Sequence, residues 1–334
     1  MSVVIDEACV ARVAARLRGL DLRTASYATV EGALPPLDAP QLREYYFFLC
    51  TLLFDFKGMA GVLGGKQYLG SDLFFALALR AVLKDPQAFA VQRMAKIDTA
   101  QFDAILSLDG NPSHPATPRG AERARLLRET AQALLQRYGG SLERLVHDSK
   151  GLLRRDDGRG LLDVLGDMPG YSDPHLKKAF VLLKIWQRLG LWEARDRHNL
   201  FIPVDYHLLR VALRSGMVQV EDAEWRQRLR DKAEATVSEE EHIRAAAKQA
   251  YKRVEQLSGI DVFTLDEIIW TLGRSCCHHD RQPRCDACDR TCCSVMQSFV
   301  YACPGRCPLT GACRGSGDTA YRALFEPALE TTYY

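Results

Sequence analysis

The chain has 334 residues, of which 47% are hydrophobic and 26% charged, and its formal net charge is +2. This length and apolar content are ample for a large core and predict one large domain or two packed lobes. The nearly balanced charge argues against a globally basic surface that binds nucleic acid nonspecifically. No apolar stretch reaches the roughly 18 residues that a membrane span needs, so we expect no membrane partner.

The first twenty residues carry early acids and show no small-residue cleavage site, which is not typical of a signal peptide. We therefore expect a cytoplasmic protein, acting as a monomer. Thiols in the cytoplasm are kept reduced, so clustered cysteines there indicate metal binding rather than disulfides.

Helical periodicity dominates the chain, and no convincing series of alternating strands appears. An all-α fold is therefore expected. Its predicted helices are 71–83, 120–138, 175–189, 206–215, 238–257 and 265–272. We expect Ser71 or Asp72 to cap the first of these helices, and Gly139 to end the second.

Nine of the eleven cysteines fall between Cys276 and Cys313, in a loop-like stretch near the C-terminus. Thiolates this dense, at CxxC and CxxxC steps, indicate metal ligands. The other two, Cys9 and Cys50, are expected to be buried and inert. We expect the metal to have a structural role, because closed four-thiolate sites leave no open coordination position.

The clustered cysteines divide into two consecutive tetrads. The first is Cys277, Cys285, Cys288 and either Cys292 or Cys293, and the second is Cys293, Cys303, Cys307 and Cys313. Four thiolates can hold zinc or an iron–sulfur cluster, and spacing alone does not choose between one metal site and two. Cys276 is an alternate ligand or a bystander, and His278 and His279 are alternative zinc ligands.

The run LDEIIWTLGRSCCHHDRQPRCDAC resembles the C-terminal end of endonuclease III-type DNA glycosylases, in which a helix ends in Gly-Arg before a cysteine and a Pro-Arg-Cys-x-x-Cys element. The ending CPLTGAC is similar to the last ligand pair of that family. This resemblance implies a 4Fe–4S cluster held in a C-terminal loop, with zinc as an alternative or second metal. The loop would present Arg281, Arg284 and Arg290 to a phosphate backbone.

A second informative segment runs from 165 to 216 and includes MPGYSDPHLKKA and then FIPVDYHLLRVALRSG. A turn feeds a helix that carries Lys177 and Lys178, and a loop then delivers Asp205 to the start of another helix. A carboxylate can stabilise an oxocarbenium-like sugar or activate water, and an amine can attack the anomeric carbon. Such a pair suits cleavage of an N-glycosidic bond.

This layout resembles the helix-hairpin-helix DNA glycosylase superfamily, which implies a two-lobed helical fold with a C-terminal cysteine-rich metal-cluster loop. VDYHLLRVALRSG is similar to archaeal 8-oxoguanine glycosylases and to queuosine-salvage nucleoside hydrolases, and the latter likeness extends over roughly residues 45–272. Carried onto this chain, it implies Asp205 as the catalytic carboxylate and Lys177 as the lysine. It also implies Phe54 and Phe56 as residues that stack the base.

The resemblance extends to residues around the hairpin and the carboxylate. Gly170 and Ser172 would bring backbone N–H groups to a DNA phosphate. Tyr171 would wedge against a base or simply pack, and His207 would face ligand or solvent. We expect three segments: a helical N-glycosylase-like domain at 1–272, an iron–sulfur loop at 273–317 and a tail at 318–334.

Each site residue also has a plainer interpretation. Asp205 could serve only as a helix N-cap, for which aspartate is a favoured residue. Lys177 and Lys178 could form a solvated face, and the sequence does not separate them. Phe54 and Phe56 lie in an apolar run that is typical of core packing.

The favoured hypothesis is a DNA N-glycosylase that flips a modified or damaged base out of double-stranded DNA and hydrolyses its glycosidic bond. One alternative is an N-glycosyl hydrolase of free queuosine-type (7-deazaguanine) nucleosides or nucleotides. Another is a noncatalytic nucleic-acid-binding protein. Lyase activity through Lys177 stays open, and both DNA repair and attack on modified invading DNA fit the pattern.

Overall fold

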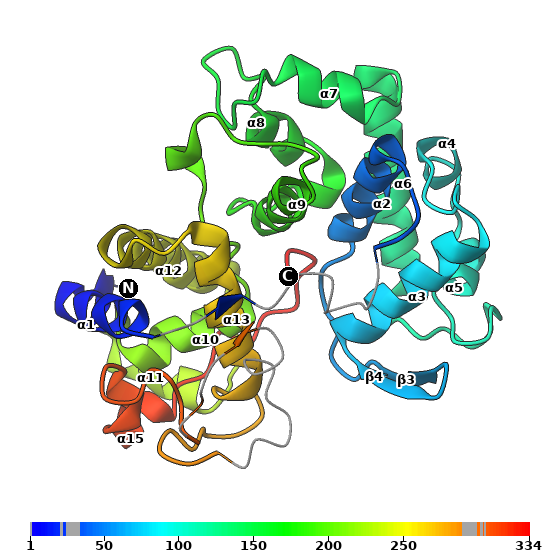
Figure 1. Ribbon diagram of the computed structural model, residues 1–334. Coiled ribbons are helices and arrows are strands. Elements are labelled where there is room, and N and C mark those ends of the chain that lie inside the picture. The colour runs from blue at the N-terminus through cyan, green and yellow to red at the C-terminus, as the bar shows by residue number, and fades with distance from the viewer. Residues whose placement is uncertain (1, 21–22, 25–33, 289–298, 301–302, 304) are drawn as a thin grey trace. The chain divides into compact units, whose positions relative to one another are not determined.

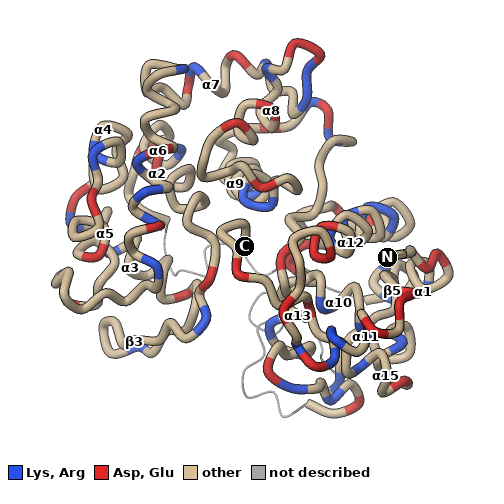
Figure 2. Tube along the Cα trace, turned by 180° about the vertical axis from the view of Figure 1, so that it is seen from behind, with Lys and Arg blue, Asp and Glu red and all other residues tan. Residues whose placement is uncertain are grey.

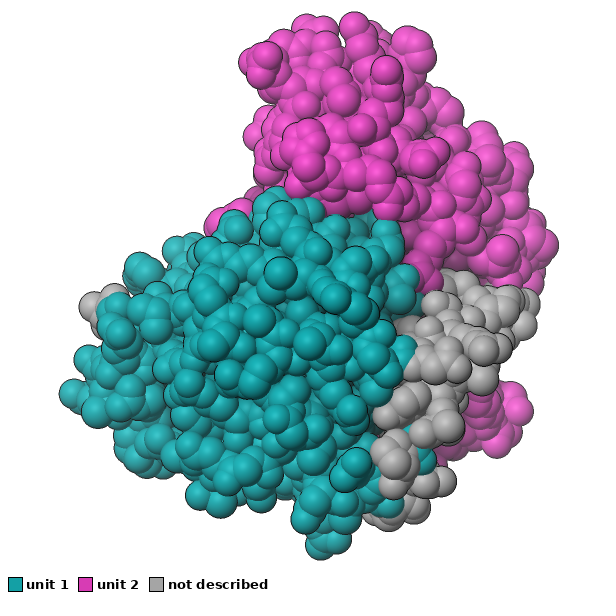
Figure 3. Space-filling view, turned by 60° about the vertical axis from the view of Figure 1, so that its left-hand side comes forward, with its two compact units in different colours: residues 1–30, 201–330 teal, residues 31–200, 331–334 magenta. Residues whose placement is uncertain are grey.

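The computed structural model describes residues 2–20, 23–24, 34–288, 299–300, 303 and 305–334. The chain divides into two compact units: unit 1 comprises 1–30 and 201–330, and unit 2 comprises 31–200 and 331–334 (Figure 3). The described residues are mostly helical (Figure 1), which confirms the predicted all-α class. The domain boundaries predicted at residues 272 and 317 both fall inside unit 1 and stay predictions.

Unit 2 is a group of helices with one short β-hairpin. Its α2 begins at a capping box of Asp38 and Gln41, and its α6 ends at Gly139, whose φ of 63° confirms the predicted stop. Phe47, Phe48 and Trp186 are fully buried in its core. The helices are α2 (Ala39–Thr51), α3 (Ser71–Lys84), α4 (Val91–Met94), α5 (Thr99–Ile105), α6 (Gly120–Tyr138), α7 (Leu142–Asp148), α8 (Leu161–Gly166) and α9 (Lys177–Arg188), with 3-10 turns η2 (Pro169–Tyr171) and η3 (Arg197–Asn199), and the hairpin pairs β3 (Ala60–Leu63) with β4 (Lys66–Leu69).

Unit 1 is built around α10, whose residues from His207 to Ser215 are all buried. The helix α13 packs against α10, and α12 packs against both α1 and α10. Val3 of β1 lies opposite Val220 of β5 in an antiparallel pair. The helices are α1 (Glu7–Arg18), α10 (Tyr206–Ser215), α11 (Ala223–Arg230), α12 (Val237–Ser258), α13 (Val262–Ser275) and α15 (Thr319–Arg322), with η4 (Arg314–Ser316), and the strand pairs are β1 (Val3–Ile5) with β5 (Val218–Val220) and β2 (Arg23–Thr24) with β6 (Phe299–Val300).

Three predictions about helix starts are wrong in detail. The helix predicted at 265–272 is α13, which begins earlier, at Val262, behind the Asp261 cap. Neither Ser71 nor Asp72 caps α3, because Gly70 precedes the helix with φ 55° and makes no side-chain cap bond. The helix predicted at 175–189 begins instead at Lys177. Its delay follows from Asp173, whose carboxylate accepts from the backbone N–H groups of residues 175 and 177 and so forms a turn before the helix.

Charges of both signs are interspersed along each unit (Figure 2), in agreement with the small net charge. Within the described residues, no helix is long and apolar enough to cross a membrane.

Candidate active site and cysteine-lined cavity

Asp205 stands at the N-terminus of α10 in unit 1. Its Oδ1 accepts hydrogen bonds from the backbone N–H groups of His207 and Leu208, at 2.9 and 3.1 Å. Asp205 is therefore the helix N-cap, and it is only 5% exposed. The two bonds fix the orientation of its carboxylate at the positive end of the helix dipole.

His207 lies on the first turn of α10, with aromatic rings on two sides. Its ring centroid is 4.1 Å from that of Tyr206 and 5.8 Å from that of Trp270. Burial holds the pKa of His207 well below its usual range, and the Arg210 guanidinium acts in the same direction, so the ring is neutral at pH 7. A Cβ on Gly273 would meet the His207 Cβ at 2.7 Å, so a larger residue there would displace the ring.

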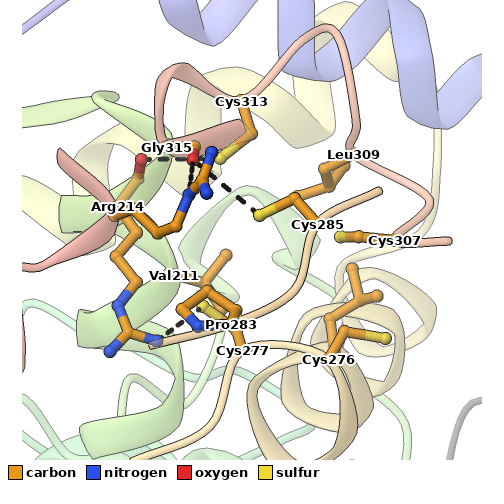
Figure 4. A pocket seen from close by; sticks show the side chains of 12 residues that line it. Val211, Arg214, Cys276, Cys277, Pro283, Cys285, Cys307, Leu309, Cys313 and Gly315 are labelled. Carbon is orange, nitrogen blue, oxygen red and sulfur yellow. Dashed lines mark hydrogen bonds between the residues drawn. The ribbon is translucent and has the colours of Figure 1, made fainter. Parts of the chain in front are cut away.

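Five cysteines line one cavity in unit 1 (Figure 4). Cys276 and Cys277 directly follow α13, whereas Cys285, Cys307 and Cys313 come from the segment beyond it. Chain segments more than thirty residues apart thus bring their thiols to the same place. The apolar part of the lining includes Val211, Leu272, Pro283 and Leu309.

Arg214 reaches this cavity from α10. Its Nη1 lies 3.4 Å from Sγ of Cys277 and donates to the carbonyl of His278 at 2.8 Å, while its Nε donates to the carbonyl of Leu324 at 2.6 Å. The arginine is 1% exposed. A buried guanidinium at this position would stabilise negative charge on the Cys277 sulfur.

Three thiols of the cavity, those of Cys285, Cys307 and Cys313, have a raised pKa and are harder to ionise than a free cysteine. Burial, with the nearby Cys307, raises the pKa of Cys285 to about 11. Burial and the same neighbour raise the pKa of Cys313, and a hydrogen bond with Cys276 is the main cause that raises the pKa of Cys307. A metal that bound here would displace thiol protons, so its binding would strengthen with pH.

The donor chemistry of the cavity fits a four-thiolate metal centre, either zinc or an iron–sulfur cluster. In the described part of the chain, however, no three Cys, His, Asp or Glu side chains converge closely enough to hold an ion as they stand. The fit therefore rests on the shared cavity and on the kind of donor, not on a finished coordination geometry.

Two other predicted ligands, Cys288 and Cys303, lie outside the lining of the cavity. Cys288 is exposed, and Sγ of Cys303 lies 3.7 Å from the carbonyl of Arg306, outside the lining of the cavity. Cys293 and its alternative Cys292 fall outside the described residues, as does Arg290. The two consecutive tetrads stay predictions, but the described cysteines of the cavity are drawn from both.

Lys177 and Lys178 begin α9 in unit 2, and both are buried. Nζ of Lys177 donates to the carbonyl of Leu53 at 3.2 Å, and Nζ of Lys178 donates to that of Thr51 at 2.6 Å. Their exposed fractions are 8% and 2%, so the interpretation as a solvated helix face is wrong. Burial, reinforced by Lys177 and then Arg123, lowers the pKa of Lys178 well below its usual value. An amine in such surroundings is more easily neutral and hence nucleophilic.

Phe54 lies under three cations of the same unit. The Arg123 and Arg119 guanidinium groups are 4.1 and 5.1 Å from its ring centroid, and the Lys178 ammonium is 4.6 Å away. Phe54 is 1% exposed. Packing and cation–π contacts account for this ring, and its role in stacking a base stays a prediction. Phe56, which is half-buried, packs its ring against the ring of Phe74.

Gly170, the glycine of the predicted hairpin, makes close contacts inside unit 2. The backbone N–H of Gly170 donates to Oγ1 of Thr130 at 2.9 Å. A Cβ at this position would meet Thr51 at 2.6 Å and Thr130 at 2.7 Å. Close packing therefore accounts for glycine here, and its contact with DNA stays a prediction.

The remaining predicted contact residues are divided between core and surface. Tyr171 is fully buried and its hydroxyl donates to the carbonyl of Phe47 at 2.6 Å. Ser172, Arg281 and Arg284 are exposed. The three surface residues are accessible to a phosphate backbone within their own units.

The sequence interpretation missed the buried arginines. Arg123, Arg210 and Arg214 are at most 1% exposed, and none of them was predicted as a buried residue. One pattern could have found the second and third: two arginines four residues apart, inside a helix whose other residues are almost all apolar. Arginine in such a run is buried with partners.

Comparison with known proteins gives one family. The model of the AGOG family, described as N-glycosylase/DNA lyase, matches residues 185–300. This segment contains Asp205, His207 and the whole of α10 to α13, whereas Lys177 precedes it. No curated protein matches the chain. The matched segment and its helical fold support the helix-hairpin-helix DNA glycosylase superfamily for residues 185–300.

Proposed function

We propose that this protein is a DNA N-glycosylase that excises a modified or damaged base from double-stranded DNA by hydrolysing its N-glycosidic bond. The observation that carries the proposal is the match of residues 185–300 to the N-glycosylase/DNA lyase family, within which Asp205 is the N-cap of α10. The exposed Arg281 and Arg284, on the segment that follows α13, suit a partner with a phosphate backbone.

Asp205 is the proposed catalytic carboxylate. Two backbone N–H groups hold one of its oxygens, so the side chain needs no reorganisation when positive charge develops on the sugar. The carboxylate stabilises that charge, or it takes a proton from the attacking water. Protonation of the departing base is left to the solvent or to a group of the substrate complex.

Asp205→Asn is the sharpest test, because asparagine caps a helix as well as aspartate does. The variant should fold with unchanged stability and lose base release by about 10²- to 10⁴-fold. We would measure base release by mass spectrometry on a panel of modified duplexes and of free nucleosides that includes 7-deazaguanine nucleosides. Release from free nucleosides alone would favour the nucleoside hydrolase. Duplex binding without release from any substrate would favour the noncatalytic protein.

Lys177 is the proposed amine if the enzyme also nicks the strand. It begins α9 and is the less deeply buried of the two lysines. Borohydride should then trap a covalent protein–DNA adduct that is lost in Lys177→Ala and kept in Lys178→Ala. The reverse pattern would assign the nucleophile to Lys178, and no adduct in the wild type would indicate water-directed chemistry alone.

We further propose that Cys277, Cys285, Cys307 and Cys313 hold a 4Fe–4S cluster, with zinc as the alternative metal. What supports this set is the cavity that the four thiols share with Cys276. When bound, the cluster supplies a structural cross-link that orders the segment after α13. Iron, sulfide and zinc would be quantified in anaerobically purified protein. Cys277→Ser should lose the metal, and Cys288→Ser, which changes an exposed cysteine, should keep it; the opposite result would favour the consecutive tetrads.

A further inference from the structure

Arg210 is a fully buried side chain of α10 with a partner for each of its nitrogen atoms. Nε donates to the carbonyl of Cys277 at 2.6 Å, and Nη1 donates to the Glu326 carboxylate at 2.6 Å. Nη2 donates to the carbonyl of Gly273 at 2.8 Å and lies 3.0 Å from Nδ1 of His207. The guanidinium is thus held from three sides and cannot rotate away from the imidazole.

The chemistry of this contact decides which nitrogen of His207 carries the proton. A guanidinium has five N–H donors and no acceptor, so Nδ1 can share a hydrogen bond with Nη2 only through its lone pair. The proton of the neutral ring must then reside on Nε2. The carbonyl of Gly273 also lies next to the ring and acts to raise the pKa of His207, but the side-chain hydrogen bond that it accepts in the structure comes from Nη2 of Arg210.

The His207 ring is also fixed in position relative to Asp205. The backbone N–H of His207 donates to Oδ1 of Asp205, and the ring packs against Tyr206 and Trp270. A donor at Nε2 would therefore have a constant direction with respect to the carboxylate. Constant direction is what a group needs in order to orient a substrate without paying for reorganisation.

We propose that Arg210 is a positioning residue: it fixes His207 as the Nε2–H tautomer, which donates a hydrogen bond to an oxygen or nitrogen acceptor of the nucleotide cleaved at Asp205. The tautomer follows from contacts within unit 1, whereas its use on a nucleotide rests on the proposed glycosylase function. The two parts are tested by different measurements.

The tautomer is read from nitrogen NMR of protein labelled at histidine. The wild-type His207 signal, assigned by its loss in His207→Phe, should show an Nδ1 without a proton and an Nε2 with one. Arg210→Lys retains one donor and should keep this pattern, and Arg210→Met should shift the ring toward the Nδ1–H form. A wild-type ring that carries its proton on Nδ1 overturns the proposal by itself, even if Arg210→Met does not fold.

The hydrogen bond from Nε2 of His207 to the nucleotide is tested by single-turnover base release on the duplex substrate identified in the panel. His207→Phe keeps an aromatic ring of similar shape but has no N–H, and it should slow release by about tenfold, the equivalent of one hydrogen bond. An unchanged rate would overturn the role in orienting the nucleotide. If no substrate releases a base while the Nε2–H tautomer is found, the proposed function fails and the assignment of Arg210 to His207 stands.

Discussion

Both units bury cations against backbone carbonyl oxygens, but the two clusters differ in what else they contact. In unit 2, Arg123 and Lys178 donate to carbonyls at the C-terminal end of α2 and in the loop that follows. In unit 1, Arg210 also binds carbonyls, but it contacts the side chains of Glu326 and His207 in addition. The first cluster therefore holds the backbone and the Phe54 ring, whereas the second also contacts a carboxylate and a ring nitrogen of an imidazole.

The comparison shows how to interpret a buried cation. The end of a helix exposes carbonyls that carry partial negative charge, and a cation there satisfies them and complements the helix dipole. This explains Arg123 and Lys178 without any substrate. A cation whose partners include an imidazole selects one chemical form of that imidazole, which is a functional property. Substitutions in the two clusters should therefore have different consequences.

Arg123→Met should give the largest loss of stability. The variant leaves the carbonyls of Leu52, Phe54, Asp55 and Pro118 without their buried donor. We expect the free energy of unfolding to fall by about 3–5 kcal/mol, measured by urea denaturation.

The matched control for this change is Arg125→Met, on the same helix. Arg125 is exposed and pairs across the surface with Glu129, at 2.8 Å. Arg125→Met should lower the free energy of unfolding by no more than about 0.5 kcal/mol. Equal, small losses in both variants would mean that the unit 2 cluster does not hold the backbone.

Gly170→Ala tests the hairpin glycine. The added methyl group would clash with Thr51 and Thr130, so unfolding should become easier by about 1–3 kcal/mol. Gly317→Ala is the control, because nothing lies within 4 Å of its Cβ position and its φ is −116°. If Gly170→Ala left stability unchanged but weakened duplex binding at low salt, we would conclude instead that the Gly170 N–H contacts a DNA phosphate.

Several helices with clear ends were predictable from sequence, but α1 with 12 residues and α2 with 13 were not predicted, and neither were the shortest elements. The pattern of α6 ends at a glycine in the left-handed region, and α12 begins next to an acidic first turn behind the Thr236 cap. By contrast, α4 has four residues and α8 has six, too few to show a helical period. The strand pairs, two to four residues long, show no alternation for the same reason.

The candidate site was predictable where a residue's role is local, and not where it depends on distant backbone. Asp205 follows Pro-Val and precedes an apolar run, so its cap position is visible in the sequence. Two partners of Arg210 are carbonyls more than sixty residues away, which leave no trace in side-chain identity. The cavity likewise groups Cys277 with Cys313 because the chain returns to α10, a fact that consecutive spacing cannot encode.

Lys178→Met tests the buried amine through pH. The pKa of Lys178 is lowered in the folded protein, while that of an unfolded lysine is about 10.4. Between those two values the unfolded chain binds more protons, so the wild type gains stability as pH rises through this range. Relative to Lys178→Met, the free energy of unfolding of the wild type should therefore increase as pH rises toward about 10.4, the pKa of the unfolded lysine. Lys96→Met, at an exposed lysine of unit 2, should keep the wild-type slope; parallel curves for wild type and Lys178→Met would contradict the assignment.

Arg284→Ala should have the smallest effect on the fold and a specific one on binding. Arg284 is exposed, although its neighbours Pro283 and Cys285 are buried and line the cavity. Stability should change by less than about 0.5 kcal/mol. The slope of log binding constant against log salt on duplex DNA should fall by about 1, as expected for one lost phosphate contact.

The control for Arg284 is Arg12→Ala, an exposed arginine on α1 of the same unit. If both variants reduce the slope equally, the contact is general electrostatics and not a property of the cysteine segment. If only Arg284 matters, Cys277→Ser should reproduce its effect, because loss of the metal would release the segment that holds Pro283 and Cys285 in place. Buried Arg210 would then set His207 beside the carboxylate, and exposed Arg284 would contact the phosphate backbone.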